Sequence, residues 1–197
     1  MKGAWFGLAF GRLWFLGVLE SSLVLGTSLE HELIMGLADG VPILIMGTLL
    51  GVATATARDS RPRQARATIL AVPTIAVCYV VGRYFAYLVL GIDSAVATEP
   101  LGTFLWTLGI GVWVGVMYLL PGPGVEPTTA TGRAVVFGCV VYGIDWTLFN
   151  AFLLVVHDMN ALLLILRPLT DAVFVTLGVF AAETRAARAV LPPAVAR

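Results

Sequence analysis

Six long apolar stretches constrain the fold of this chain more than any other feature. A transmembrane helix needs about 20 mostly apolar residues to cross the hydrocarbon layer of a bilayer. Six stretches meet that length: residues 4–27, 33–56, 67–92, 101–120, 133–156 and 161–182. Charged residues make up only 12% of the 197 residues, whereas a soluble domain carries roughly 25%. The sequence therefore predicts an all-α integral membrane protein, a bundle of six transmembrane helices that forms a single domain over residues 1–197.

Charges in the connections predict the orientation of these helices. Nine basic residues lie at one end of the bundle: Lys2, Arg58, Arg61, Arg63, Arg66, Arg133, Arg185, Arg188 and Arg197. The connections at the other end carry Glu30, Glu32, Asp93, Glu99 and Asp158 and no Lys or Arg. By the positive-inside rule the basic end faces the cytoplasm. We therefore expect a multi-pass protein of the plasma membrane with both termini inside, and three helices per half also permit 3+3 inverted halves.

Composition excludes several classes of function. The 12 basic and 12 acidic residues leave no net charge that would attract nucleic acid. The connections are too short for a soluble catalytic domain. With only two His and two Cys, we expect no metal and no cofactor. Eleven of the 12 basic residues are Arg, a bias that suggests a GC-rich prokaryotic genome.

The chemically informative residues are ionisable side chains inside the apolar stretches. Each is costly in hydrocarbon unless it is paired or hydrated, so each is a candidate functional residue. At about 1.5 Å per residue, six of them fall in the outer half of the bilayer, and we expect them to form one polar cluster: Glu20, Asp39, Arg83, Asp145, Arg167 and Asp171. Arg12 alone falls in the cytoplasmic half, where its side chain is expected to extend to the inner surface.

Local spacing indicates how this cluster would be built. Arg167 and Asp171 are four residues apart, so we expect them to pair along one helix face. Tyr79, Arg83 and Tyr87 form one stripe of the third helix, which suits either packing or an anionic or planar ligand. Two arginines cannot neutralise four carboxylates. At least one carboxylate is therefore expected to be protonated, hydrated or paired with a group from outside the chain.

Small residues recur at four-residue spacing and allow helices to approach closely. The steps are Gly3/Gly7/Gly11, Gly36/Gly40, Gly47/Gly51 and Gly111/Gly115. We expect packing within the bundle first. Contact with a second copy or with a partner membrane subunit is the alternative.

Three classes of function fit these features, and we favour the binding or transport of a polar or anionic small molecule. The solute would enter an outward-facing polar cavity, with Arg83 and Arg167 as anchors. The other expected contacts are Glu20, Asp39, Tyr79, Tyr87, Asp145 and Asp171. In its general layout the chain resembles the six-helix substrate-binding membrane subunits of vitamin uptake systems.

The second class is an intramembrane enzyme that acts on a lipid or isoprenoid, with Glu20 and Asp171 as acid and base and Asp145 as a further candidate. This pair resembles the membrane-bound terpene cyclases of meroterpenoid pathways, which use a Glu on an early helix and an Asp on the last. That family has seven helices and an aromatic residue before the Glu, whereas this chain has six stretches and Leu19. The third class is a structural subunit of a larger membrane complex. The sequence leaves open which class applies.

The topology can be tested by cysteine labelling. Because basic residues lie at one end only, we expect a Cys at position 93 to react with an impermeant reagent in intact cells, and a Cys at position 60 to react only after the membrane is opened. Labelling of Ser60→Cys in intact cells would overturn the orientation.

Overall fold

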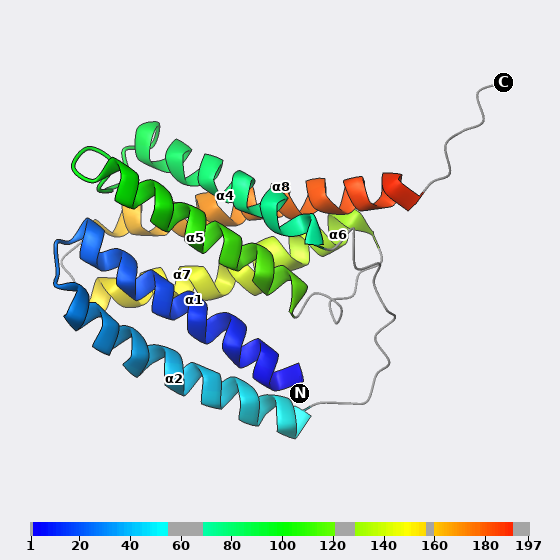
Figure 1. The fold of residues 1–197 in the computed structure, drawn as a ribbon, viewed down its shortest axis with the longest axis horizontal. Helices are drawn as coiled ribbons and strands as arrows, with labels where there is room; N and C mark the ends of the chain where they lie inside the picture. The colour runs from blue at the N-terminus through cyan, green and yellow to red at the C-terminus, as the bar shows by residue number, and fades with distance from the viewer. Residues whose placement is uncertain (1, 55–68, 121–128, 157–159, 191–197) are drawn as a thin grey trace.

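A computed structural model describes residues 2–54, 69–120, 129–156 and 160–190 of the chain. Every regular element among these residues is helical (Figure 1). The elements are α1 (Lys2–Val24), α2 (Leu29–Thr54), α4 (Ala71–Leu88), α5 (Pro100–Leu119), α6 (Ala130–Val135), the π-helix η2 (Val136–Tyr142), α7 (Gly143–Val156) and α8 (Ala161–Val190).

Six helical segments are long and apolar enough to cross a membrane, which confirms the number predicted from the sequence. The segment α6–η2–α7 forms one of them, over Ala130–Val155. Several boundaries differ from the prediction by a few residues, and two of these differences have a clear local cause or composition. The helix α4 ends at Leu88 because Gly91 takes a left-handed φ of 66°, where the backbone N–H of Ile92 donates to the carbonyl of Ala86. The helix α8 continues past residue 182 through a polar turn that includes Glu183 and Arg185.

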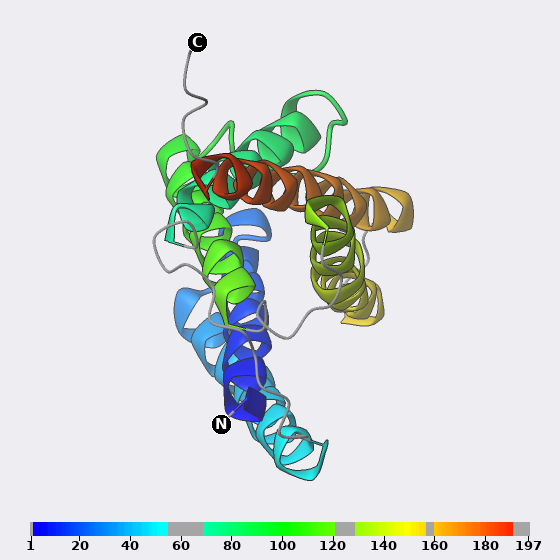
Figure 2. The same ribbon diagram turned by 90° about the vertical axis from the view of Figure 1, so that its right-hand side faces the viewer.

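The α1–α2 pair packs on the rest of the bundle mainly through α5. The helix α1 lies along α2, while α4 packs on both α5 and α8. The α6–η2–α7 segment packs on α8, and α5 also contacts α1. Figure 2 shows the α1–α2 pair and the α6–η2–α7 segment as two arms that diverge from the side formed by α4, α5 and α8. The two three-helix halves therefore pack differently, so the contacts give no support to inverted halves.

Glycines bring α1 and α2 into backbone contact. A Cβ on Gly47 would lie 2.5 Å from the Cα of Gly7, and a Cβ on Gly11 would lie 2.6 Å from the carbonyl oxygen of Gly40. On the other side of the bundle, a Cβ on Gly115 would lie 2.8 Å from the Cα of Val72 on α4. These small-residue faces are therefore occupied by helix packing within the chain, as first expected, and are not open to a partner.

The fifth span contains a turn of unusual geometry. The π-helix η2 interrupts the α-helix where Gly138 lies against the backbone of Thr176 on α8. Its last residue, Tyr142, is fully buried, whereas Val140 is exposed. Single π-helical turns are rare and are frequent at functional sites. This one forms part of the wall of a cleft described below.

Replacement of Gly47 by Leu tests the α1–α2 contact. We expect Gly47→Leu to lower the free energy of unfolding by about 1–3 kcal/mol, because overpacking at a tight contact displaces the backbone. Gly109→Leu is the matched control, since a Cβ at Gly109 would meet no atom within 4 Å. Unfolding in detergent micelles measures both variants, and equal effects would contradict the packing described here.

Candidate functional site

Arg83 on α4 lies at the centre of a buried cluster of charges. Its side chain is fully buried. The Nε atom donates to Oδ2 of Asp171 on α8 at 2.8 Å, and Nη1 donates to Oε1 of Glu20 on α1 at 2.9 Å. Arg83 therefore connects three helices that are far apart in the sequence.

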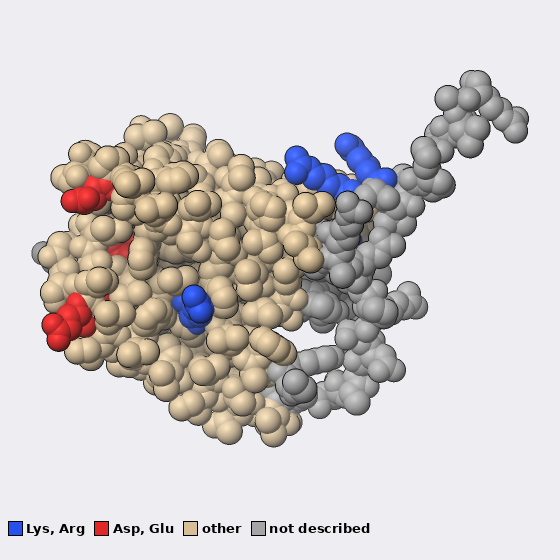
Figure 3. All heavy atoms as spheres, viewed as in Figure 1, with Lys and Arg blue, Asp and Glu red and all other residues tan. Residues whose placement is uncertain are grey.

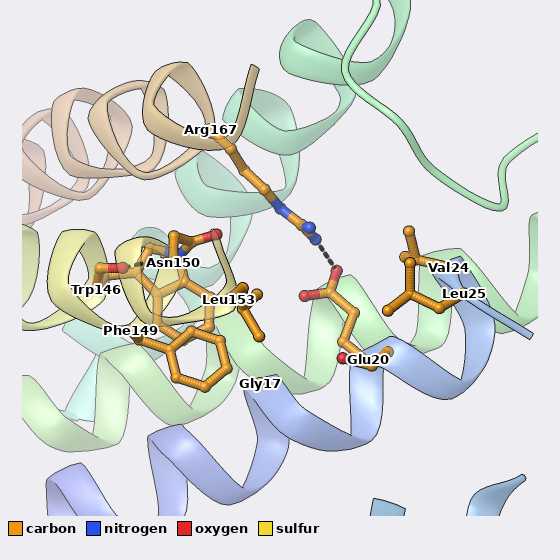
Figure 4. A pocket seen from close by; sticks show the side chains of 10 residues that line it. Gly17, Glu20, Val24, Leu25, Trp146, Phe149, Asn150, Leu153 and Arg167 are labelled. Atoms are coloured by element: carbon orange, nitrogen blue, oxygen red, sulfur yellow. Dashed lines mark hydrogen bonds and ion pairs between the residues drawn. The ribbon is translucent and has the colours of Figure 1, made fainter. Parts of the chain in front are cut away.

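Arg167 completes the cluster from the side nearer the acidic end of the bundle. Its Nη2 atom lies 2.5 Å from Oε1 of Glu20 (Figure 4). Because Nη1 of Arg83 binds the same atom, both arginines share one carboxylate oxygen. The predicted pair between Arg167 and Asp171 is wrong. Asp171 faces α4 and α7, where Arg83 and the indole of Trp146 bind it at 2.8 and 2.9 Å, while Arg167 lies one turn further out and reaches α1. Two guanidinium groups and two carboxylates thus form a charge-balanced set.

Aromatic side chains surround this set. The hydroxyl of Tyr87 accepts from Nη1 of Arg83 at 3.1 Å and donates to Oε1 of Glu20 at 3.3 Å. The guanidinium carbon of Arg83 lies 5.2 Å from the ring centre of Tyr79 and 5.7 Å from that of Trp146. The predicted tyrosine stripe therefore packs against the arginine of its own helix. Sequence reasoning missed Trp146, although its position four residues after Tyr142 could have placed both on the core-facing side of α7.

The cluster keeps spare hydrogen-bonding capacity. Several of its buried polar atoms have no hydrogen-bond partner among the described residues: the hydroxyls of Tyr79 and Tyr142, Nη2 of Arg83, Nε of Arg167 and Oδ1 of Asp171. Buried polar groups of this kind normally bind ordered water.

The space beside the cluster is small. A crevice of about 20 Å³ reaches both Glu20 and Arg167 and is lined by polar groups such as Ser21 and Asn150. A second, of about 10 Å³, reaches Arg167 beside Asp93 and Asn160. Another of about 10 Å³ lies between Glu20 and Tyr87. A water molecule needs roughly 10–15 Å³, so each crevice holds one or two waters. The predicted outward-facing polar cavity is therefore not found beside these arginines in the described part of the chain.

Asp39 and Asp145 lie apart from the cluster, so the prediction of one six-residue cluster is wrong for these two. Asp145 immediately precedes Trp146, and neighbouring residues of a helix point in directions about 100° apart. Asp145 therefore faces α1, where the indole of Trp14 donates to its carboxyl oxygens at 3.2 and 3.3 Å. Asp39 belongs to α2, which packs mainly on α1. Asp39 forms no hydrogen bond or ion pair with the described residues.

These two carboxyl groups line a cleft of about 620 Å³ between α1, α2 and the η2–α7 segment. The rest of the wall is apolar, and the cleft has no Lys or Arg in its lining: Phe6, Phe10, Trp14, Ala38, Pro42, Ile43, Met46, Val140, Val141, Ile144 and Leu148. Met46, Ile144 and Leu148 are more than half exposed. The cleft therefore opens on the apolar outer surface of helices that are long and apolar enough to cross a membrane.

The remaining polar features lie at the ends of the bundle. At the basic end Nε of Arg133 donates to Oε2 of Glu183 at 2.8 Å, and the Tyr118 hydroxyl donates to the other oxygen. At the acidic end His31 is exposed, while His157 and Asp158 lie outside the described residues. Over the described ranges no three His, Cys, Asp or Glu side chains are grouped as a metal site would require.

Replacement of Arg83 tests whether the cluster holds the bundle together. We expect Arg83→Gln to lower the free energy of unfolding by about 3–5 kcal/mol, because it leaves Asp171 buried without its cation. Arg188→Gln, an exposed arginine at the basic end of α8, is the control and should change stability by less than about 0.5 kcal/mol. Denaturant titration in micelles gives both values. An Arg83→Gln protein as stable as the control would show that the cluster does not stabilise the fold.

Comparison with family models, with curated proteins and with solved structures finds no match to this chain. The resemblance to terpene cyclases therefore depends on Glu20 and Asp171 alone, which bind the same guanidinium group from opposite sides.

Proposed function

We propose that this chain binds an amphipathic small molecule from the lipid phase, one with an apolar body and a cationic or other hydrogen-bond-donating head group. The observation that carries this proposal is the cleft between α1, α2 and η2–α7. Its volume of about 620 Å³ falls in the range of roughly 300–1,000 Å³ typical of small-molecule sites, which are mostly apolar with a few well-placed polar groups.

The polar groups of the cleft are acceptors, which favours a donor as the ligand's head group. Asp39 and Asp145 each supply a carboxyl group. Pro42 has no N–H, so the carbonyl oxygen of Ala38 lacks its usual partner in the helix α2. The indole of Trp14 orients Asp145, while Asp39 has no partner among the described residues. An amine on a long apolar chain would satisfy such a set and leave its hydrocarbon against Ile144 and Leu148.

An anionic solute held by Arg83 and Arg167 is less well supported. Both guanidinium groups are already bound to Glu20 or Asp171, and the adjoining crevices hold only water-sized volumes. The same limit applies to an enzyme that would use Glu20 and Asp171 as acid and base, because its substrate would need room beside them.

The proposal includes transport of the ligand, a location in the plasma membrane and an orientation with both termini in the cytoplasm. The orientation is supported by the separation of charge along the bundle. In Figure 3 the acidic side chains gather at the end where α1 meets α2, and most of the basic side chains gather at the opposite end, near the end of α8. Cationic ends of this kind remain on the cytoplasmic side during insertion.

Photolabelling with a lipid-like amine tests the proposed site. The protein in lipid nanodiscs would be exposed to a diazirine-bearing octadecylamine, and separately to the matching fatty acid. We expect the amine to label α2 and α7, and the labelling affinity to fall about tenfold in Asp39→Asn and in Asp145→Asn, since each removes a charged acceptor worth ~1.4 kcal/mol.

Two controls make the outcome decisive. Asp93→Asn removes an exposed carboxylate beyond the end of α4 and should leave labelling unchanged. Equal labelling by the amine and the fatty acid, or labelling that survives the double variant Asp39→Asn/Asp145→Asn, would refute an acceptor-lined site.

A further inference from the structure

An unpaired cation lies on the opposite side of α1 from the cleft. Arg12 falls within the membrane span Gly3–Val24, and its side chain is exposed. It forms no hydrogen bond or ion pair with the described residues. Its guanidinium carbon lies 4.8 Å from the ring centre of Trp113 on α5.

The depth of this guanidinium decides which anions can reach it. Trp113 lies six residues before Leu119, the last residue of α5, which corresponds to about 9 Å along the helix. Arg12 therefore packs on α5 at that depth, and the expectation that it extends to the inner surface is not met. Lipid phosphates lie outside the hydrocarbon layer, so they are too far away to pair with it. Arginine stays charged in proteins, and an unpaired charge that faces hydrocarbon is strongly unfavourable.

Apolar residues at helical spacing from Arg12 form a surface on α1 and α5. Trp5, Leu105 and Val112 are well exposed, and together with Leu8, Arg12 and Gly109 they make up what we call the Arg12 face. A Cβ on Gly109 would meet no atom within 4 Å, so this residue leaves a notch in the surface. Small residues at such positions let a neighbouring helix approach closely.

Hydrogen bonds hold this face in place before any partner arrives. The indole of Trp113 donates to the carbonyl of Ala9 at 3.0 Å, and the indole of Trp106 donates to the carbonyl of Leu16 at 3.3 Å. Both bonds run from α5 to α1 on either side of Arg12. The face is therefore preorganised, which lowers the entropic cost of binding.

We propose that the Arg12 face binds a transmembrane helix of a partner protein that carries a carboxylate at the depth of Trp113. The carboxylate supplies the missing counter-charge through a charge-assisted hydrogen bond, and the notch at Gly109 admits the partner's backbone. The membrane-depth carboxylates of this chain itself, Asp39 and Asp145, are recessed in the cleft on the other side of α1, so a second copy presents no matching helix. This interface is independent of the ligand proposed for the cleft.

Synthetic transmembrane peptides provide the test. One peptide of about 22 leucine and alanine residues carries a single Glu six residues from its inner end, and its matched control carries Gln there. Energy transfer between the labelled full-length protein and each labelled peptide is measured in vesicles of phosphatidylcholine. We expect the Glu peptide to associate about tenfold more tightly than the Gln peptide.

Variants of the protein assign that preference to Arg12. It should disappear in Arg12→Leu and persist in Arg188→Leu, which removes an exposed arginine at the helix end. Gly109→Leu keeps the charge but fills the notch, and should weaken association with the Glu peptide without lowering stability. Asp39→Asn should leave the preference unchanged, so failure of the cleft proposal and failure of this one are distinguishable.

Four results would overturn the proposal. The first three are equal association of the Glu and Gln peptides, a Glu preference that survives Arg12→Leu, and Arg12-dependent association of the protein with itself in the absence of peptide. Loss of the Glu preference on addition of phosphatidylglycerol would assign the face to anionic lipid instead and would also overturn it.

Discussion

The ion network at Arg83 is the interaction on which the arrangement of the bundle depends. A guanidinium group in an apolar interior is tolerated only when its charge and its donors are satisfied. Here Glu20 from α1 and Asp171 from α8 balance the charge and bind Nη1 and Nε, across 63 and 88 residues of sequence. The positions of α1 and α8 relative to α4 are therefore set by electrostatics as well as by packing. Arg167 makes the set neutral, so no net charge remains in the interior.

Because Arg83 and Arg167 are already paired with carboxylates, they do not have the character of a binding site for an external anion. A site that binds an external anion keeps its cations available, whereas these cations already have carboxylate partners. The charged groups without a charged partner among the described residues lie elsewhere. Asp39 and Asp145 line the cleft between α1, α2 and η2–α7, and Arg12 lies on the far side of α1. The ionic charges of the interior are thus paired, whereas Asp39, Asp145 and Arg12 have no counter-ion among the described residues.

The number of spans was predictable from the sequence because hydrophobic length is a property of each stretch alone. Packing of Gly7 and Gly11 on α2 was predictable for a similar reason, since small-residue spacing is local. The direction in which each charge points was not predictable. It depends on how a helix is rotated, and Asp145 and its neighbour Trp146 differ by one position yet face a lipid-exposed cleft and the core. The choice of Arg83 over Arg167 as the partner of Asp171 likewise required the placement of α4 against α8.

The helix α1 contributes to both the cleft and the ion network, through residues on different faces. Trp14 and Phe10 form one wall of the cleft, while Glu20, further along the same helix, holds both arginines through a single oxygen. A movement of α1 with α2 that widens the cleft would draw that oxygen away from both guanidinium groups together. The cleft and the ion network therefore share one helix, so a change in the position of α1 would alter both at once.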